Sequence, residues 1–143
     1  MFIGEFRHNL DEKGRLAIPA KFRNKLAEGC IATRGVDQCL EIYPADVWQK
    51  KAQKIASLPV SQKDARSFAR LTLSGAMQLD LDKQGRVTLP DYLRRYSKMN
   101  KKSVVVGLYD HLEVWEEKEW DKLRDETEKK SSEIVENLSD LGI

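Results

Sequence analysis

The chain has 143 residues, 41% of them hydrophobic, which is enough for one sizeable core or two small coupled cores. It has no run of about 18 apolar residues and no charged-then-apolar start like that of a secretory signal, so we expect a soluble protein that is neither exported nor inserted in a membrane. The net charge of +2 conceals an asymmetry: residues 1–109 carry 20 Lys and Arg against 11 Asp and Glu, a difference of +9, whereas residues 110–143 carry 5 against 12, a difference of −7. The basic part is the candidate surface for an anionic partner, unless the acidic tail serves only to keep the protein soluble.

The first predicted element is a hairpin that bends at DEKG, residues 11–14. Apolar residues alternate on both sides of this bend, as they do in paired strands, and Gly14 supplies the positive φ that tight turns need. Asp11 is placed to accept backbone N–H groups two or three residues further on, which would fix the turn. Arg15 follows the bend, where its side chain either folds back on Asp11 or projects from the hairpin.

A short helix and two strands are predicted to follow the hairpin. Pro19 stands where the first turn of a helix tolerates a missing N–H, and residues 20–29 continue that helix. Strands are expected at residues 30–34 and 39–44, joined by a tight turn.

Cys30 and Cys39 fall in this pair of strands. With only two lone histidines elsewhere, they do not form a zinc-binding spacing. Because we expect an intracellular setting, buried free thiols are favoured over a disulfide.

Two helices are predicted next, at residues 45–59 and 61–75. The first is expected to stop near Pro59. The second opens with a variant capping box, Ser61 to Asp64, and carries its apolar residues on about one face. This connector is therefore expected to be ordered.

The sequence then repeats itself. LDEKGRLAIP, residues 10–19, returns as LDKQGRVTLP at residues 81–90, a shift of 71, and LEIY at 40–43 matches LEVW at 112–115 after a shift of 72. Nearly the whole chain thus consists of two copies of one unit. Because short hairpins are marginal alone, each copy is predicted to need the other, with strands interleaved in one shared barrel.

The second copy is predicted to have a helix at residues 91–100 and strands at 103–107 and 112–115. Residues 116–140 then show a long acidic helical pattern with sparse apolar positions. This helix either lies solvated along the body or contacts a neighbouring subunit.

These elements predict an α+β fold, mainly β, in which the two copies form one pseudo-twofold β-barrel with peripheral helices. We expect a first repeated domain at residues 1–56, a helical connector at 57–75, a second repeated domain at 76–122 and an acidic C-terminal helix at 123–143.

Arg15 and Arg86 are the main candidate DNA contacts. A guanidinium offers five donors in a planar fork, which suits phosphate oxygens or the O6 and N7 atoms of guanine. An exposed Asp-Arg pair adds little stability, so stability alone is a weak reason to hold this geometry twice. The alternative is purely structural turns with a solvated basic face. The other candidate DNA-binding residues are Arg7, Lys13, Lys21, Arg23, Lys83 and Arg94, and the candidate turn-supporting residues are Asp11, Gly14, Asp82 and Gly85.

Catalysis is not expected. His8 and His111 are isolated, and no nucleophile-base arrangement, phosphate-binding glycine loop or zinc-protease motif is present. Asp11 and Asp82 could converge as paired carboxylates, but a neighbouring Arg lowers the pKa of each and weakens it as a general acid. We therefore expect no enzyme activity, no metal and no cofactor.

Several segments together resemble the MraZ family, bacterial proteins with two AbrB-type (SpoVT-AbrB) domains in tandem. These segments are MFIGEFRHNLDEKGRLAIPAKFR, ATRGVDQCLEIYP, SLPVSQKDARSFAR followed by LSGA, and LDKQGRVTLP. The resemblance covers nearly the full chain and both D-x-x-x-R motifs.

The resemblance implies that the two repeated domains are AbrB-type (SpoVT-AbrB) domains, that they form a swapped-hairpin β-barrel, and that subunits join into a closed homo-oligomeric ring. It also implies a cytoplasmic, nucleoid-associated regulator of transcription for the division and cell-wall gene cluster, which binds short direct repeats in double-stranded DNA ahead of its own operon. The DNA-contact role of the D-x-x-x-R motif passes to Arg15 and Arg86 with their Asp partners. Lys83 stands where the first copy has Glu12, so the two turns are expected to contribute unequally. An antitoxin-like interaction module and a scaffold that binds no DNA remain the alternatives.

Overall fold

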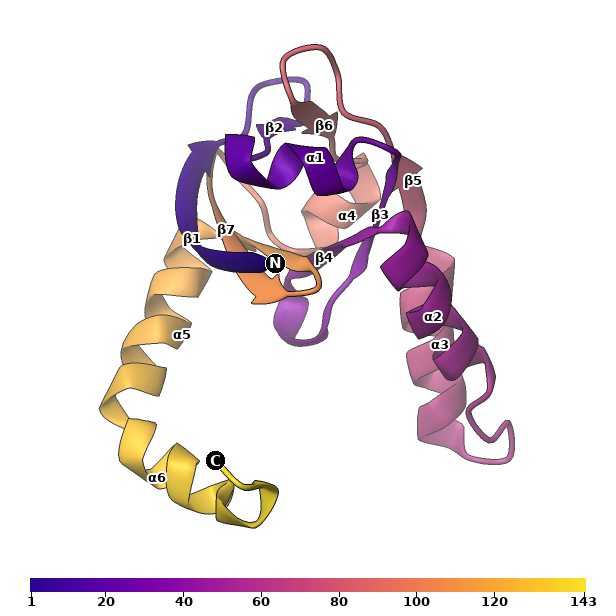
Figure 1. Cartoon of the computed structure of the whole chain (residues 1–143), viewed down its shortest axis with the longest axis vertical. Coiled ribbons are helices and arrows are strands. Elements are labelled where there is room, and N and C mark those ends of the chain that lie inside the picture. Colours follow the sequence, from indigo (N-terminus) through magenta and orange to yellow (C-terminus); the bar gives the residue numbers. More distant parts are fainter.

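The computed structural model describes all residues from 1 to 143. Its strands are β1 (Phe2–Asn9), β2 (Arg15–Ala17), β3 (Cys30–Arg34), β4 (Leu40–Pro44), β5 (Met77–Leu79), β6 (Arg86–Thr88), β7 (Lys102–Tyr109) and β8 (Leu112–Glu116). Its α-helices are α1 (Arg23–Leu26), α2 (Ala45–Ala56), α3 (Lys63–Gly75), α4 (Asp91–Tyr96), α5 (Glu117–Lys129) and α6 (Ser131–Asn137), with short 3-10 turns at Ala20–Phe22, Val36–Gln38 and Ser139–Leu141. The predicted mixture of strands and peripheral helices is confirmed (Figure 1).

Six strands form one antiparallel sheet in the order β1-β7-β8-β4-β3-β5, and β2 pairs with β6 in a separate ribbon. β1 pairs with β7 and β5 pairs with β3, so both outer pairings join one copy of the repeat to the other. The predicted interleaving of the copies is therefore confirmed. The large sheet ends at β1 and β5 and does not close into the predicted barrel, because β2 and β6 bond to each other instead of bridging its two edges.

The predicted pairing of strands across each D-x-x-G-R turn is wrong. The alternation of apolar residues suggested that the strand before the turn pairs with the strand after it. Instead, β1 pairs with β7, and β2 pairs with β6 of the other copy. Alternation fixes which face of a strand is buried, but it does not specify the partner strand.

A pseudo-twofold axis relates the two copies. The strand order reads the same from either end once β1, β3 and β4 are exchanged for their repeat equivalents β5, β7 and β8. Equivalent residues face each other where the axis crosses paired strands, Leu16 opposite Val87 and Glu41 opposite Glu113. Leu16 and Val87 are fully buried and belong to one core shared by both copies. This shared core holds the ribbon against the large sheet.

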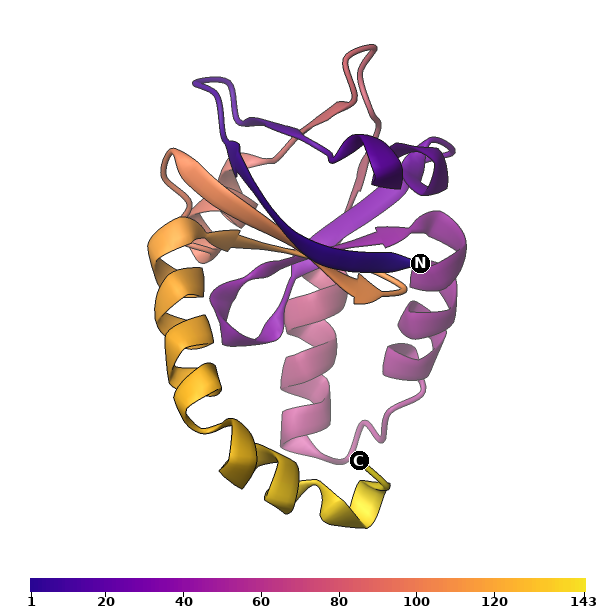
Figure 2. The same cartoon turned by 60° about the vertical axis from the view of Figure 1, so that its left-hand side comes forward.

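Two helical arms extend from the body away from the ribbon, α2 with α3 and α5 with α6 (Figures 1 and 2). Each arm begins with an equivalent aromatic contact: the rings of Trp48 and Tyr43 lie 5.7 Å apart, as do the rings of Trp120 and Trp115. The ordered connector predicted between the copies is confirmed by α2 and α3. No helix combines the length and the apolar character needed to cross a bilayer.

Helix ends depart from the prediction in three places. The capping box from Ser61 to Asp64 is not formed, because Gln62 occupies the N-cap of α3 and Ser61 therefore lies one residue too early. The acidic tail is not one helix: it breaks at Lys130, whose φ of −104° and ψ of 12° separate α5 from α6. The expected boundary at residue 123 falls inside α5, which runs on without interruption.

Cys30 and Cys39 are buried free thiols, as predicted. Burial raises the pKa of Cys30 to about 11, and it raises the pKa of Cys39 as well. Both thiols are therefore protonated at neutral pH and weakly nucleophilic.

Candidate nucleic-acid interface

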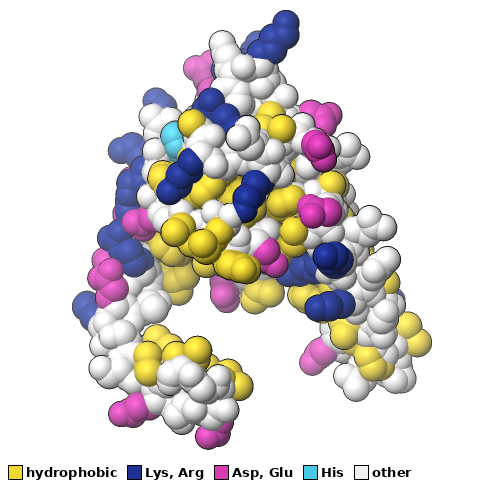
Figure 3. All heavy atoms as spheres, in the orientation of Figure 1, with side chains coloured by type: hydrophobic (Ala, Val, Ile, Leu, Met, Phe, Trp, Pro, Cys, Tyr) yellow, Lys and Arg dark blue, Asp and Glu magenta, His cyan; other side chains and the backbone are white.

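The two D-x-x-G-R turns project as two separate loops from the end of the molecule opposite the arms (Figure 2). Each turn enters one strand of the β2-β6 ribbon. At this apex a dark blue Lys or Arg side chain projects at the top of Figure 3, with magenta Asp or Glu side chains near it. The turn sequences thus occupy the most projecting part of the body.

The first turn is closed by the carboxylate of Asp11. Its Oδ1 atom accepts the backbone N–H groups of Lys13 at 3.0 Å and Arg15 at 2.8 Å, and its Oδ2 atom accepts Nε of Arg15 at 2.5 Å. Gly14 adopts a φ of 78°, as the turn requires. The backbone hydrogen bond from Arg15 is the main cause that holds the pKa of Asp11 below its ordinary value. The carboxylate therefore stays ionised and the turn stays closed at neutral pH.

The second turn repeats this arrangement. Asp82 Oδ1 accepts the backbone N–H groups of Gln84 and Arg86 at 2.9 Å each, and Oδ2 accepts Arg86 Nε at 2.9 Å. Gly85 has a φ of 75°. The pKa of Asp82 is lowered chiefly by the backbone hydrogen bond from Arg86. Asp11, Gly14, Asp82 and Gly85 thus lie where the predicted turn-supporting roles require them.

The two turns are bonded to each other and form one unit. The backbone N–H of Ile18 donates to the carbonyl of Gly85 at 3.0 Å, and the N–H of Leu89 donates to the carbonyl of Gly14 at 2.8 Å. Between these bonds, β2 and β6 pair in register. The spacing of the two turns is consequently fixed by main-chain hydrogen bonds rather than by flexible side chains.

Arg15 and Arg86 each use only one part of the guanidinium inside the chain. Nε bonds the turn aspartate, whereas the terminal nitrogens of both side chains make no hydrogen bond within the chain; the nearest carboxylate contact is Arg86 Nη1 at 4.0 Å from Asp11 Oδ2. The side chains are 32% and 28% exposed. Both sequence alternatives are therefore realised together: each side chain folds back through Nε and keeps a donor edge for an outside acceptor.

Four other candidates lie around the turns. Lys13 and Lys83 are exposed within them. Arg23 Nε donates to the carbonyl of Ile18 at 2.9 Å, and Arg94 Nε makes the equivalent bond to the carbonyl of Leu89 at 3.0 Å. These two guanidinium groups lie against the turns and are half-buried.

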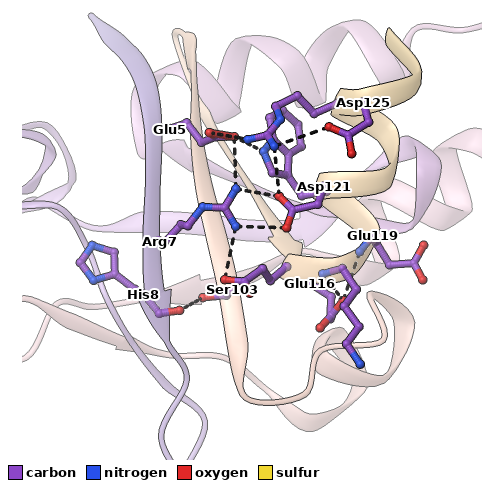
Figure 4. Close-up of polar contacts among 12 residues, drawn as sticks. Glu5, Arg7, His8, Ser103, Glu116, Glu119, Asp121 and Asp125 are labelled. Atoms are coloured by element: carbon purple, nitrogen blue, oxygen red, sulfur yellow. Dashed lines mark hydrogen bonds and ion pairs between the residues drawn. The ribbon is translucent and has the colours of Figure 1, made fainter. Parts of the chain in front are cut away.

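The structure places the last two candidates, Arg7 and Lys21, elsewhere. Arg7 points from β1 toward α5, where Nη2 lies 2.6 Å from Asp121 and Nη1 lies 3.3 Å from Glu117 (Figure 4). The hydrogen bond to Asp121 raises the pKa of Arg7, and the same contact lowers the pKa of Asp121. Lys21 is exposed, with Nζ 4.7 Å from the ring centroid of Phe6. Arg7 is thus engaged by the C-terminal arm, not by the turns.

Asp11 and Asp82 do not act as a free pair of carboxylates, because each is bonded to its own turn and Arg. A different acidic group converges around the pseudo-twofold axis: Glu41, Glu113 and His111 have ligand atoms within 4.8 Å of one another. Lys51 Nζ lies 3.7 Å from Glu41, and Trp115 Nε1 donates to Glu113 at 3.0 Å. Side chains of the protein thus already partner both carboxylates in this cluster.

Sequence reasoning treated His111 as isolated and missed this cluster. A usable signal was present, because Glu41 and Glu113 occupy equivalent positions of the repeat. Equivalent residues near a twofold axis lie next to each other. If the two copies pair through equivalent strands, equivalent residues of those strands are therefore expected to be in contact. The missing information was which strand lies on the axis.

Comparisons with known proteins agree with the duplicated architecture. The family model described as "MraZ protein, putative antitoxin-like" matches twice, over residues 1–71 and 72–141. The "Transcriptional regulator MraZ" of Halothermothrix orenii is 46% identical over 143 residues, which cover all of both chains. The proteins of the same name from Desulforamulus reducens and Natranaerobius thermophilus are 46% identical over 141 residues (99% of each chain) and 44% identical over 143 residues (all of both chains). The two successive matches and the full-length relatives show that this chain belongs to the MraZ family.

Proposed function

We propose that this protein regulates transcription by binding double-stranded DNA through the paired turns that present Arg15 and Arg86. The observation that carries the proposal is the duplicated geometry: two ionised aspartates hold two guanidinium groups with unbonded terminal nitrogens at a fixed spacing. The names of the full-length relatives, all "Transcriptional regulator MraZ", support the same role. The chemistry at this site is recognition, not catalysis.

The ribbon suits a DNA groove. A major groove admits a two-stranded β-ribbon, and Arg bonds guanine O6 and N7 or phosphate oxygens. In this mechanism Lys13 and Lys83 contact phosphates and set the register, while the two arginines reach base edges. Because main-chain bonds preset the distance between the turns, little ordering is needed on binding.

The finer proposal concerns the DNA and the cell. The sites are short direct repeats ahead of the protein's own operon, in the division and cell-wall gene cluster, and the protein acts in the cytoplasm at the nucleoid. Each repeat is bound weakly by one subunit. A homo-oligomeric ring that engages several repeats together gains affinity through effective concentration.

Two features of the arms support self-association. The tail exposes apolar side chains on α6 and beyond, including Val135 at 48% and Leu141 at 73% exposed, and these appear as yellow spheres on the lower arm in Figure 3. The arms also carry opposite charge: residues 45–75 have six Lys and Arg against two Asp, whereas residues 117–143 have five Lys and Arg against nine Asp and Glu. An acidic arm of one subunit therefore complements the basic arm of the next.

Footprinting on the DNA upstream of the gene tests the proposal directly. The unaltered protein should protect regularly spaced repeats, and Arg15→Ala together with Arg86→Ala should abolish that protection while light scattering shows an unchanged assembly. Arg66→Ala is the matched control, because this Arg bonds the carbonyl of Val60 in the α2-α3 arm, and light scattering checks that its assembly is unchanged as well. Unchanged protection in the double variant would remove the contact role, and absence of binding to any fragment would favour the scaffold alternative.

Salt dependence gives a second test. Each phosphate contact releases condensed counterions, so the logarithm of the association constant should fall linearly with the logarithm of salt concentration, with a slope of about 0.9 per contact. The slope is measured by fluorescence anisotropy across a salt series. A flat response would contradict the basic apex as the DNA surface.

A further inference from the structure

Arg23 and Arg94 make a crossed contact that links the two turns. Each bonds a carbonyl of its own copy through Nε, Arg23 to Ile18 and Arg94 to Leu89. The rest of each guanidinium then lies over the glycine of the other copy's turn. Arg23 covers Gly85, and Arg94 covers Gly14.

The closeness of this contact is shown by what a methyl group would meet at each glycine. A Cβ atom at Gly85 would overlap Nε of Arg23 and lie 2.5 Å from its Cζ atom. A Cβ atom at Gly14 would lie 2.9 Å from Nε of Arg94 and 3.0 Å from its Cζ atom. Both glycines are buried although they stand in projecting turns. The planar side chain from the opposite copy therefore forms one wall of each turn.

We infer that Arg23 and Arg94 are positioning residues, each of which holds the DNA-contacting turn of the opposite copy in its closed shape. Arg23 acts on the turn that carries Arg86, and Arg94 acts on the turn that carries Arg15. This inference deepens the proposed DNA-binding function and rests on it for its consequence, but the crossed contact itself is testable without DNA.

The inference assigns these arginines a role different from direct contact. Their Nε donors are used within the chain, and each guanidinium lies close to the glycine of the other copy's turn. Removing Arg23 leaves the aspartate of its own turn untouched, since Asp11 is bonded by Lys13 and Arg15. The turn that loosens should instead be the one in the other copy, which is distant in sequence.

Hydrogen exchange measured by NMR on the full-length protein tests the crossed contact. In Arg23→Ala, the amides of Gln84 and Arg86, which bond Asp82, should exchange about fivefold faster, as expected when roughly one hydrogen bond's worth of support is lost. The amides of Lys13 and Arg15 should keep their rates. Arg94→Ala should show the mirror pattern, with the first turn loosened and the second unchanged.

Arg23→Lys separates shape from charge. Lysine keeps the positive charge but has neither a planar face nor an Nε–H at that position, so it should not restore the slow exchange of the second turn. Restoration by lysine would overturn the positioning role. Equal acceleration in both turns, or acceleration only in the first turn, would overturn it as well.

A double-mutant cycle on DNA affinity tests whether the positioning of the turns matters for DNA binding. If Arg23 acts through Arg86, Arg23→Ala should weaken DNA binding in the otherwise unaltered protein. It should cause little further loss of affinity once Arg86→Ala is present. Combined with Arg15→Ala, by contrast, the two losses of binding free energy should add in full. Full additivity with both variants would make Arg23 an independent phosphate contact and overturn the inference. If no variant affects DNA binding while the crossed exchange pattern is seen, the proposed function fails and the positioning of the turns stands.

Discussion

The two copies of the sequence repeat form similar contacts at the apex but different contacts in the arms. At the apex, the hydrogen bonds that close each turn have counterparts in the other copy, and so do the crossed arginines over the two glycines. In the arms, only the aromatic contacts are duplicated. The ion pair between Arg7 and Asp121 has no counterpart, because the equivalent positions are Gln78 and Gln49.

The two regions differ in whether their contacts join one copy of the repeat to the other. At the apex, the main-chain bonds between the turns and the crossed arginines join the two copies, so each copy is part of the other's structure. The arms lie away from the axis, and each can change without disturbing its counterpart. One arm is the helical hairpin of α2 and α3, and the other is the acidic pair α5 and α6 with an exposed apolar tip.

The largest expected effect is a loss of stability when a core residue at the pseudo-twofold axis is truncated. Leu16→Ala should lower the free energy of unfolding by about 2–5 kcal/mol, because the side chain is fully buried and faces its repeat equivalent Val87. Val87→Ala should cost less by about 0.8 kcal/mol, the contribution of one methylene. Urea denaturation followed by circular dichroism measures both. A larger cost at Val87 would show that the two copies do not share the core evenly.

A charge change in one turn should sharpen the comparison between the turns. Glu12→Lys gives the first turn the charge that Lys83 gives the second, so DNA affinity should rise about threefold to tenfold and the salt slope should steepen by about 0.9. Fluorescence anisotropy with operator DNA measures both quantities. Glu133→Lys makes the same charge change on α6 and should leave the affinity for a fragment with a single repeat nearly unaltered, because ring assembly adds nothing to binding at one repeat. Equal gains in the two variants would mean that only net charge matters.

The arms should respond more weakly. Arg7→Gln makes the second arm resemble the first, and it should lower the melting temperature by no more than about 3 °C, because its partners are exposed and already hydrated. Gln78→Ala, at the equivalent position, should have no measurable effect. Differential scanning fluorimetry at low and high salt checks both, and the effect of Arg7→Gln should shrink as salt screens the ion pair. A large loss would mean that α5 anchors the fold.

The smallest effect at neutral pH concerns protonation of the turn aspartates. The pKa values of Asp11 and Asp82 are lowered in the folded protein, so the stability they contribute is fully present above the unfolded value and is lost only as pH falls through the lowered folded value. The turns should therefore be unchanged from pH 8 to pH 5 and should loosen only below about 3.8, the ordinary Asp value. Carbon-13 shifts of the two side-chain carboxyl groups give the midpoints. A midpoint above 3.8 in either residue would contradict the closed turn.

Local chemistry was readable from the sequence. An Asp followed by a Gly three residues later specifies a turn in which the carboxylate caps nearby amides, and the duplicated motif pointed to two such turns and to the Arg that follows each. Hydrogen bonds of this kind join residues at most four apart, so no knowledge of the remaining fold is needed. The helices α2 and α3 were predictable for the same reason, whereas the free thiols were predicted from the expected intracellular setting.

The partners of the strands were not readable. The same alternation of apolar residues fits β1 paired with β2 or with β7, and only the shared burial of both copies favours the pairing across the axis. That pairing also places Arg23 over Gly85 and Arg7 next to α5. Neither contact can be predicted from the spacing of residues along the chain. The physical reason is range: turns form from neighbours in sequence, whereas partner choice depends on which arrangement removes the most apolar surface of the whole chain from water.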